Sequence, residues 1–200
     1  MSGIMCIGIG ALHDTSSAQN AQILELLKSF NVSYNNQVDL RALCSFVFCK
    51  SEGQSAFNNL DEAQKGEGDV FEIKDGFPFY YVKNTNRELL KYTNGEMRKL
   101  FMVFLELLNK FKPDVILSYG DDFFVSSVSA ESSRRNIPQV HFALKLKNEI
   151  AQGYADFCID SKKIASYKKD INTFAKDLLP LLSKKASVNP QYFRSGYAYK

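Results

Sequence analysis

The sequence predicts an α/β fold of the Rossmann-like, doubly wound type, in which helices cover both faces of a mostly parallel sheet. Apolar, strand-like runs alternate with amphipathic helical segments along the 200 residues. Residues 110–160 read as strand, polar loop, helix, strand, helix and strand, the unit from which parallel sheets are built. The hydrophobic content of 45% is sufficient for one large core.

The first predicted elements are a strand, a helix and a second strand. Residues 4–9 form an apolar run, and a polar loop leads from it to Ser16 and Gln19, which have the spacing of a capping box at a helix start. The apolar face of this helix carries Ile23, Leu24, Leu27 and Phe30. We expect a polar connection over residues 31–39. Residues 42–49 are nearly continuous in apolar side chains, as is typical of a strand covered on both faces.

A hairpin is predicted near the middle of the chain. Residues 51–69 are rich in Gly, Gln, Asn, Asp and Glu, which indicates a long loop. Strand-type residues then flank Asp75 and Gly76 within residues 70–82, and Asp-Gly is a strong hairpin turn signal. The sheet is therefore expected to carry a hairpin excursion near residues 70–82.

The clearest helix in the sequence follows the hairpin. Thr93 and Glu96 have capping-box spacing, and Pro113 stops the helical pattern. Apolar residues recur at helical spacing, which marks a face packed on the core. These residues are Leu100, Phe101, Phe104, Leu107, Leu108 and Phe111.

Three short strands and a long helix complete the pattern. Residues 115–117, 139–142 and 157–159 are the predicted strands. Ser161 is placed to cap a final helical region that extends to about Leu182. We expect residues 1–185 to form one domain, and residues 186–200 to form a tail or the start of a linker to a further domain.

Composition excludes several classes of function. A net charge of +3, spread along the chain, does not favour nucleic acid as a partner. The lysine pairs at residues 162–163, 168–169 and 184–185 indicate a solvated face, with weak peripheral contact to an anionic membrane as the alternative. The four cysteines form no CxxC pair, so no metal site is predicted. No signal peptide or long apolar run is seen, so we expect a cytoplasmic location, at most peripheral to the inner face of a membrane.

The loop after the first strand is the first candidate site. Gly8 and Gly10 begin a dinucleotide fingerprint, but the third glycine would fall on His13, so no bound cofactor is predicted. The loop still leads into a helix N-terminus, where backbone N–H groups favour phosphate or carboxylate. Gly10, His13 and Asp14 are therefore candidate ligand-binding residues, and an ordinary polar loop is the alternative.

The second candidate site follows the strand at residues 115–117. Gly120 permits close approach of the backbone to a ligand, beside Tyr119. The carboxylates of Asp121 and Asp122 are suited to orient sugar hydroxyls or to act as a general base, although Asp122 also fits a helix N-cap. His141 ends the next strand, where a core position and a catalytic position are both open.

Four motifs follow one another from residue 70 to residue 170: the hairpin with DGFPFYYV, the run PDVILSYGDD, the strand NIPQVHFAL and the segment ADFCIDS at residues 155–161. Their order and spacing resemble the amino-terminal half of retaining glycosyltransferases of family 4. The resemblance implies two facing Rossmann-like domains. This chain would be the acceptor-binding half, and a carboxyl-terminal half would bind most of the nucleotide-sugar donor. Alone, this chain is not expected to transfer sugar.

The resemblance also implies partners and residue roles. The expected partners are a sugar or lipid-linked acceptor and the donor domain, with the nucleotide sugar as co-substrate and no metal. A family histidine that lines the cleft falls by spacing on Leu144 or Lys145, with His141 a few residues earlier. Asp121 and His141 are the catalytic candidates, whereas Lys145 and Asp122 are candidates for ligand binding.

Two alternatives remain open. The non-hydrolysing UDP-N-acetylglucosamine 2-epimerases have strand-loop segments that Tyr119-Gly120-Asp121 and the IPQVH strand also resemble. The acidic residue that follows their histidine is not present, because Phe142 and Ala143 stand there. The other alternative is a non-catalytic α/β module that binds a sugar or a protein.

Overall fold

The computed structural model describes residues 2–9, 18–34, 38–46, 69–74, 77–83, 94–121, 123–144 and 147–183. Its strands are β1 (Ser2–Ile7), β2 (Val38–Phe46), β3 (Asp69–Lys74), β4 (Phe77–Lys83), β5 (Val115–Tyr119), β6 (Gln139–Phe142) and β7 (Phe157–Ile159). Its helices are α1 (Ala18–Ser33), α3 (Asn94–Phe111), α4 (Phe123–Arg134), α5 (Glu149–Tyr154), α6 (Ser161–Lys169) and α7 (Ile171–Ser183).

The strands form one sheet in the order β3-β4-β2-β1-β5-β6-β7. Every neighbouring pair is parallel except β3 and β4, which are antiparallel. When β3 is set aside, the parallel strands stand in the order third, second, first, fourth, fifth and sixth along the chain. This is the strand order of the doubly wound Rossmann fold, so the predicted fold class is confirmed.

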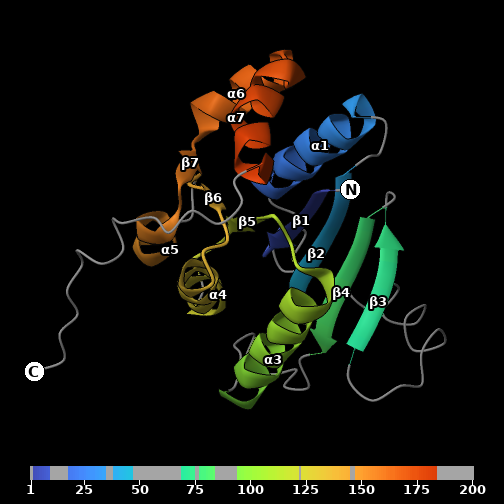
Figure 1. Cartoon of the computed structure of the whole chain (residues 1–200), viewed down its shortest axis with the longest axis vertical. Coiled ribbons are helices and arrows are strands. Elements are labelled where there is room, and N and C mark those ends of the chain that lie inside the picture. The colour runs from blue at the N-terminus through green and yellow to red at the C-terminus, as the bar shows by residue number, and fades with distance from the viewer. Residues whose placement is uncertain are drawn as a thin grey trace, which may run out of the picture.

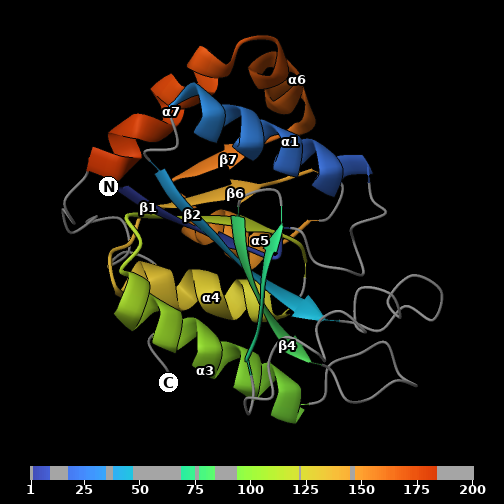
Figure 2. The ribbon, with the colours of Figure 1, turned by 90° about the vertical axis from the view of Figure 1, so that its right-hand side faces the viewer.

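Helices cover the two faces of the sheet, as Figures 1 and 2 show. α1, α6 and α7 pack on one face with the inward side chains of β1, β2, β5, β6 and β7. α3, α4 and α5 pack on the other face. Burial alternates strictly between the two cores: Ile4 and Cys6 of β1 point to the first, and Met5 and Ile7 point to the second.

β1 is joined to the distant strand β5 by backbone and side-chain bonds. The Gly3 amide donates to Asp114 Oδ2 at 2.7 Å, and the Asp114 amide donates back to the Gly3 carbonyl at 2.8 Å. These residues are 111 positions apart in sequence. The pair fixes the register of the two central strands, because Ile4 then lies opposite Val115.

Most predicted elements are confirmed within two residues. The hairpin is present as β3 and β4, with its turn at residues 75–76 outside the described residues. α3 buries Leu100, Phe104, Leu107 and Leu108, and the helix ends before Lys112, which takes a positive φ of 50° ahead of Pro113. The predicted loop at residues 51–69 and the tail at residues 186–200 lie almost wholly outside the described residues.

Two element boundaries differ from the prediction. β2 begins at Val38, within the predicted polar connection, because Val38 and Leu40 point inward while Asp39 and Arg41 pair with each other at 2.9 Å. Arg41 also lies over the Phe111 ring at 4.2 Å, so the helix α3 covers the polar side of the strand start. The start of β2 therefore alternates apolar with charged residues, so a strand predicted from a continuous apolar run begins too late.

The predicted last helix is two helices, and its cap is one residue earlier than expected. Asp160, not Ser161, is the N-cap of α6, since its carboxylate accepts from the Lys163 amide at 2.9 Å. The chain breaks at Asp170, whose backbone is extended and whose carboxylate accepts from the Asn172 amide at 3.0 Å and from Thr173 Oγ1 at 2.8 Å. A capping aspartate inside an amphipathic pattern therefore ends one helix and begins the next.

Candidate functional site at the ends of β1 and β5

The ends of β1 and β5 lie side by side at the centre of the sheet, where the strand order changes direction. β1 leads through α1 toward β2, and β5 leads through α4 toward β6 on the other side. The two helices cover opposite faces of the sheet (Figure 2). Open parallel sheets bind ligands in the crevice that such a divergence creates beyond the strand ends.

Each of the two strands is followed at once by a glycine of positive φ. Gly8 follows β1 with φ of 73°, and Gly120 follows β5 with φ of 116°. A Cβ atom on Gly8 would lie 2.1 Å from the Tyr119 carbonyl oxygen, so only glycine lets the two strand ends meet this closely. The Gly8 amide also donates to the Leu43 carbonyl at 3.2 Å, which joins the end of β1 to β2.

The loop after β5 presents an exposed carboxylate. Asp121 is exposed directly after Gly120, while the Tyr119 side chain is buried and donates from its hydroxyl to Gln19 Oε1 of α1 at 3.4 Å. Tyr119 therefore contributes its backbone to this edge, and its ring belongs to the core under α1. An exposed carboxylate accepts hydrogen bonds from hydroxyl groups, which suits a sugar ligand.

Asn148, at the start of α5, holds this loop through a hydrogen bond. Its Nδ2 donates to the Gly120 carbonyl at 3.3 Å, and its Oδ1 accepts from the Ala151 amide at 2.9 Å as the N-cap of α5. Ser126 of α4 donates to the same Oδ1 at 3.1 Å. The sequence interpretation did not single out Asn148, although an asparagine directly before Glu149 and an apolar residue is a readable N-cap signal.

His141 lies in the interior rather than at the surface of the edge. It is fully buried on the face covered by α4 and α5, where its Nδ1 lies 2.9 Å from Ser118 Oγ of the neighbouring strand. Burial lowers the pKa of His141 to about 4, so the ring is neutral near pH 7. Its Nε2 has no hydrogen-bond partner in the structure. The ring is thus placed to support the end of β5 through its contact with Ser118.

Other predicted site residues lie outside the described residues. They are Gly10, His13, Asp14, Asp122 and Lys145. Their roles in ligand binding stay predictions. Of the candidates that the structure describes, Tyr119 ends β5, Gly120 and Asp121 follow it in the loop, and His141 contacts Ser118 of the same strand.

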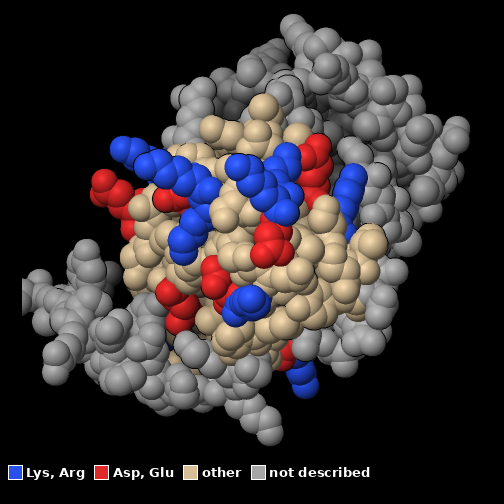
Figure 3. All heavy atoms as spheres, turned by 90° about the horizontal axis from the view of Figure 1, so that it is seen from above, with Lys and Arg blue, Asp and Glu red and all other residues tan. Residues whose placement is uncertain are grey.

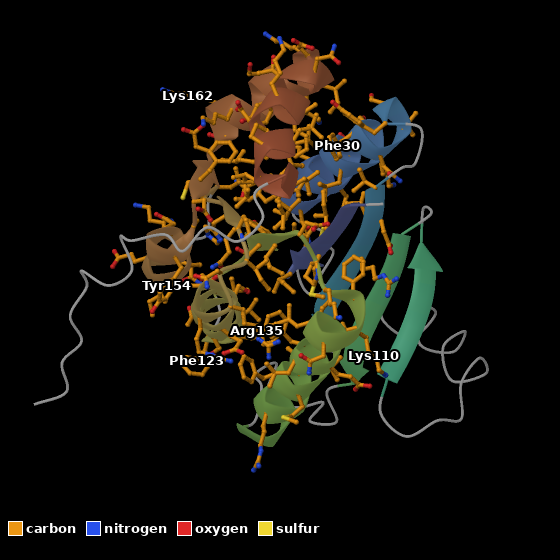
Figure 4. All side chains as sticks on the ribbon, viewed as in Figure 1. Phe30, Lys110, Phe123, Arg135, Tyr154 and Lys162 are labelled. Atoms are coloured by element: carbon orange, nitrogen blue, oxygen red, sulfur yellow. The ribbon has the colours of Figure 1, made fainter. Side chains whose placement is uncertain are left out.

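A layer of buried polar side chains runs along the contact of α4 and α5 with the sheet, from the candidate loop to the start of β6. Figure 4 shows side chains filling the space between these helices and the sheet, with Phe123 and Arg135 marking α4 and Tyr154 marking α5. Gln139 of β6 donates from Nε2 to the Ser129 carbonyl at 2.9 Å. The polar members of the layer are Ser118, Ser126, Ser129, Ser132, Gln139, His141 and Asn148.

The remaining charged side chains of the described residues do not indicate a second candidate site. No group of three or more His, Cys, Asp or Glu side chains that could hold a metal ion occurs among the described residues. The lysines of α6 lie among acidic side chains over α1, α6 and α7 (Figure 3), and Lys168 pairs with Glu25 at 2.6 Å. In the described ranges, no helix combines the length and apolar character needed to cross a membrane.

Comparisons with known proteins give similarity at the level of chain arrangement. No family model matches the sequence, and no curated protein matches it. Among solved structures, UDP-GlcNAc 2-epimerase from Neisseria meningitidis bound to UDP-GlcNAc is similar, with 12% identity, a TM-score of 0.46, and coverage of 84% of this chain and 43% of that chain. A putative UDP-N-acetylglucosamine 2-epimerase from Listeria monocytogenes has 10% identity and a TM-score of 0.49, with coverage of 84% and 43%.

A third similar structure is a protein of unknown function from Vibrio parahaemolyticus. It has 10% identity and a TM-score of 0.44, and the match covers 82% of this chain and 94% of that chain. This chain spans less than half the length of the two epimerases. Likeness of this degree does not assign an activity to this chain.

Proposed function

We propose that this chain is the acceptor-binding domain of a glycosyltransferase, and that the acceptor lies beyond the ends of β1 and β5. The observation that carries the proposal is the pair of positive-φ glycines, Gly8 and Gly120, at the point where the strand order changes direction. Gly8 lets the ends of β1 and β5 meet, because its added Cβ would lie 2.1 Å from the Tyr119 carbonyl oxygen. At Gly120 an added Cβ would lie 3.6 Å from Val125 Cγ2, so the backbone there is open to close approach by a ligand.

The charge of the loop favours a hydroxyl-bearing ligand over a diphosphate. Asp121 is exposed beside Gly120, and the sequence continues with the carboxylate of Asp122. Two carboxylates repel a phosphate group, whereas they accept hydrogen bonds from sugar hydroxyls. This is the charge pattern expected for the acceptor side of a transfer reaction, with the nucleotide part of the donor held by a second domain.

The reaction would follow from this division of the ligands. The acceptor hydroxyl oxygen forms a bond to the anomeric carbon of the donor sugar, and the bond from that carbon to the phosphate oxygen breaks. The nucleoside diphosphate leaves, and the hydroxyl proton passes to its phosphate oxygen or to solvent. In this scheme Asp121 orients the acceptor hydroxyl, and neutral His141, bonded to Ser118, holds the end of β5 in place.

A nuclear magnetic resonance titration tests the proposal. The ¹⁵N-labelled chain is titrated separately with N-acetylglucosamine, a panel of mono- and disaccharides, UDP and UDP-GlcNAc. We expect saccharides to shift the amide resonances of Gly8, Gly120 and Asp121, and UDP alone to leave them unchanged. Asp121→Asn keeps the size of the side chain but removes its charge, so it should weaken saccharide binding about tenfold, as loss of a charged hydrogen-bond acceptor does.

The alternatives predict different results in the same titration. Shifts at these amides with UDP and not with saccharides would contradict the acceptor proposal and favour a domain like those of the nucleotide-sugar epimerases. Silence toward every ligand, or shifts confined to the α6 and α7 side, would favour a non-catalytic module. Lys163→Gln, on the exposed face of α6, is the matched control and should bind saccharides as the parent chain does.

A further inference from the structure

We propose that Asn148 is a positioning residue for the candidate site, because it fixes the direction of the Gly120–Asp121 peptide group. The structural part of this inference stands on the geometry alone, and its ligand-binding part rests on the proposed function. Asn148 is 5% exposed and belongs to α5, yet its amide reaches the loop after β5.

The orientation of the Asn148 amide is determined by the donors around it. Its Oδ1 accepts from the Ala151 amide at 2.9 Å and from Ser126 Oγ at 3.1 Å. Both partners are donors in this arrangement, so the oxygen of the amide must face them, and the Nδ2 group must face the Gly120 carbonyl. Asn148 thereby joins α4, α5 and the loop through one side chain.

The bond to the Gly120 carbonyl controls a group on the ligand side of the loop. The Gly120 C=O and the Asp121 N–H belong to one planar trans peptide unit, so they point in opposite directions. Holding the carbonyl toward Asn148 directs the Asp121 N–H away from Asn148. Glycine at a φ of 116° gains little conformational restriction from its own residue type, so this external bond supplies the restriction.

The test removes the donor and keeps the acceptor. Asn148→Asp retains an oxygen for Ala151 and Ser126 and remains a good N-cap, but it no longer donates to Gly120. Asn148→Ser also retains a capping oxygen, lacks the Nδ2 group that donates to Gly120, and adds no charge. Ser127→Ala, one residue from Ser126 in α4, is the matched control because Ser127 donates to the Phe123 carbonyl and not to this network.

Two readouts separate loop order from ligand binding. In the unliganded chain, we expect both Asn148 variants to retain the helical circular dichroism signal, while the ¹⁵N order parameter of the Asp121 amide falls from about 0.85 to below about 0.6. If the parent chain binds saccharides, both variants should bind about tenfold more weakly, and Ser127→Ala should bind within about twofold of the parent.

The outcomes are distinguishable. If the parent chain binds no saccharide, the proposed function fails, and the order parameter of the Asp121 amide alone decides the role of Asn148. An unchanged order parameter in both variants overturns the positioning role, and so does parent-like affinity in variants of a chain that does bind. A loss in Asn148→Asp but not in Asn148→Ser would overturn it as well, because the effect would then come from the added charge.

Discussion

The closest backbone approach in the candidate site makes Gly8→Ala the most informative single substitution. The added Cβ atom meets the Tyr119 carbonyl oxygen at 2.1 Å, a distance that requires the ends of β1 and β5 to move apart. The positive φ of 73° adds about 1–2 kcal/mol for a residue with a side chain. Overpacking of this kind adds about 1–3 kcal/mol, so the expected loss of unfolding free energy is about 2–5 kcal/mol.

Two other glycines in the structure provide graded controls for this magnitude. Gly120→Ala also requires a positive φ, here 116°, but its Cβ would meet Val125 Cγ2 at an ordinary 3.6 Å, so it should lose only the backbone strain of about 1–3 kcal/mol. Gly153, in α5, has nothing within 4 Å of the added Cβ, so Gly153→Ala should gain about 0.5–1 kcal/mol.

Urea unfolding, followed by far-ultraviolet circular dichroism, measures all three changes at one pH and temperature. The expected order of stability is Gly153→Ala, the parent chain, Gly120→Ala and then Gly8→Ala. If Gly8→Ala lost no more than Gly120→Ala, the close contact between the ends of β1 and β5 would be wrong. An unfolded Gly8→Ala chain would be consistent with the reasoning only if Gly120→Ala remained folded.

Three further predictions concern titration, reactivity and a helix contact. The pKa of His141 falls from 6.5 to about 4 on folding, so the unfolded chain binds the extra proton between these values and stability falls as the pH drops through that window. The parent chain should therefore lose about 2 kcal/mol more than His141→Gln between about pH 7 and pH 5 in urea unfolding, and equal losses would contradict burial of a neutral ring. Burial raises the pKa of the Cys6 thiol to about 12, whereas Cys158 is only partly buried. Iodoacetamide should therefore alkylate Cys158 well before Cys6 in the native chain, as measured by peptide mass spectrometry. Equal rates of alkylation would place Cys6 at the surface. The Tyr167 hydroxyl of α6 donates to Asp177 Oδ2 of α7 at 2.6 Å. Tyr167→Phe removes this hydrogen bond, so the unfolding free energy should fall by about 1 kcal/mol and the melting temperature by about 2–4 °C. An unchanged melting temperature would argue against the bond.

The sequence predicts the type of each element better than the contacts between distant elements. Strand and helix patterns are local, and they identified β5, β6, β7 and α3 closely. Which strand lies beside β1 depends on pairing across more than a hundred residues, and no local pattern contains that information. For this reason the sequence showed Gly8 only as part of an incomplete dinucleotide-binding motif. The structure explains the glycine by its close contact with the Tyr119 carbonyl of β5.

The face to which a residue points was harder to predict than the strand that carries it. β6 is buried on both faces, and its sequence Gln-Val-His-Phe alternates polar with apolar side chains. The alternation separates the two faces of the strand, but it does not say which helices cover each face. His141 could be assigned to a strand end but not to the side of α4 and α5, where it bonds Ser118. Asn148 had a readable capping pattern, but its bond to Gly120 arises only from the packing of α5 against α4.

The paired bonds between Gly3 and Asp114 have a consequence for synthesis of the chain on the ribosome. β1 is the strand between β2 and β5, and it gains its second neighbour only after 111 further residues have been added. Until then, one edge of β1 carries unpaired N–H and C=O groups beside a row of apolar side chains. Such long-range pairing slows folding, so we expect nascent chains that stop before β5 to bind chaperones and to aggregate, and the sheet to close only once β5 has left the exit tunnel.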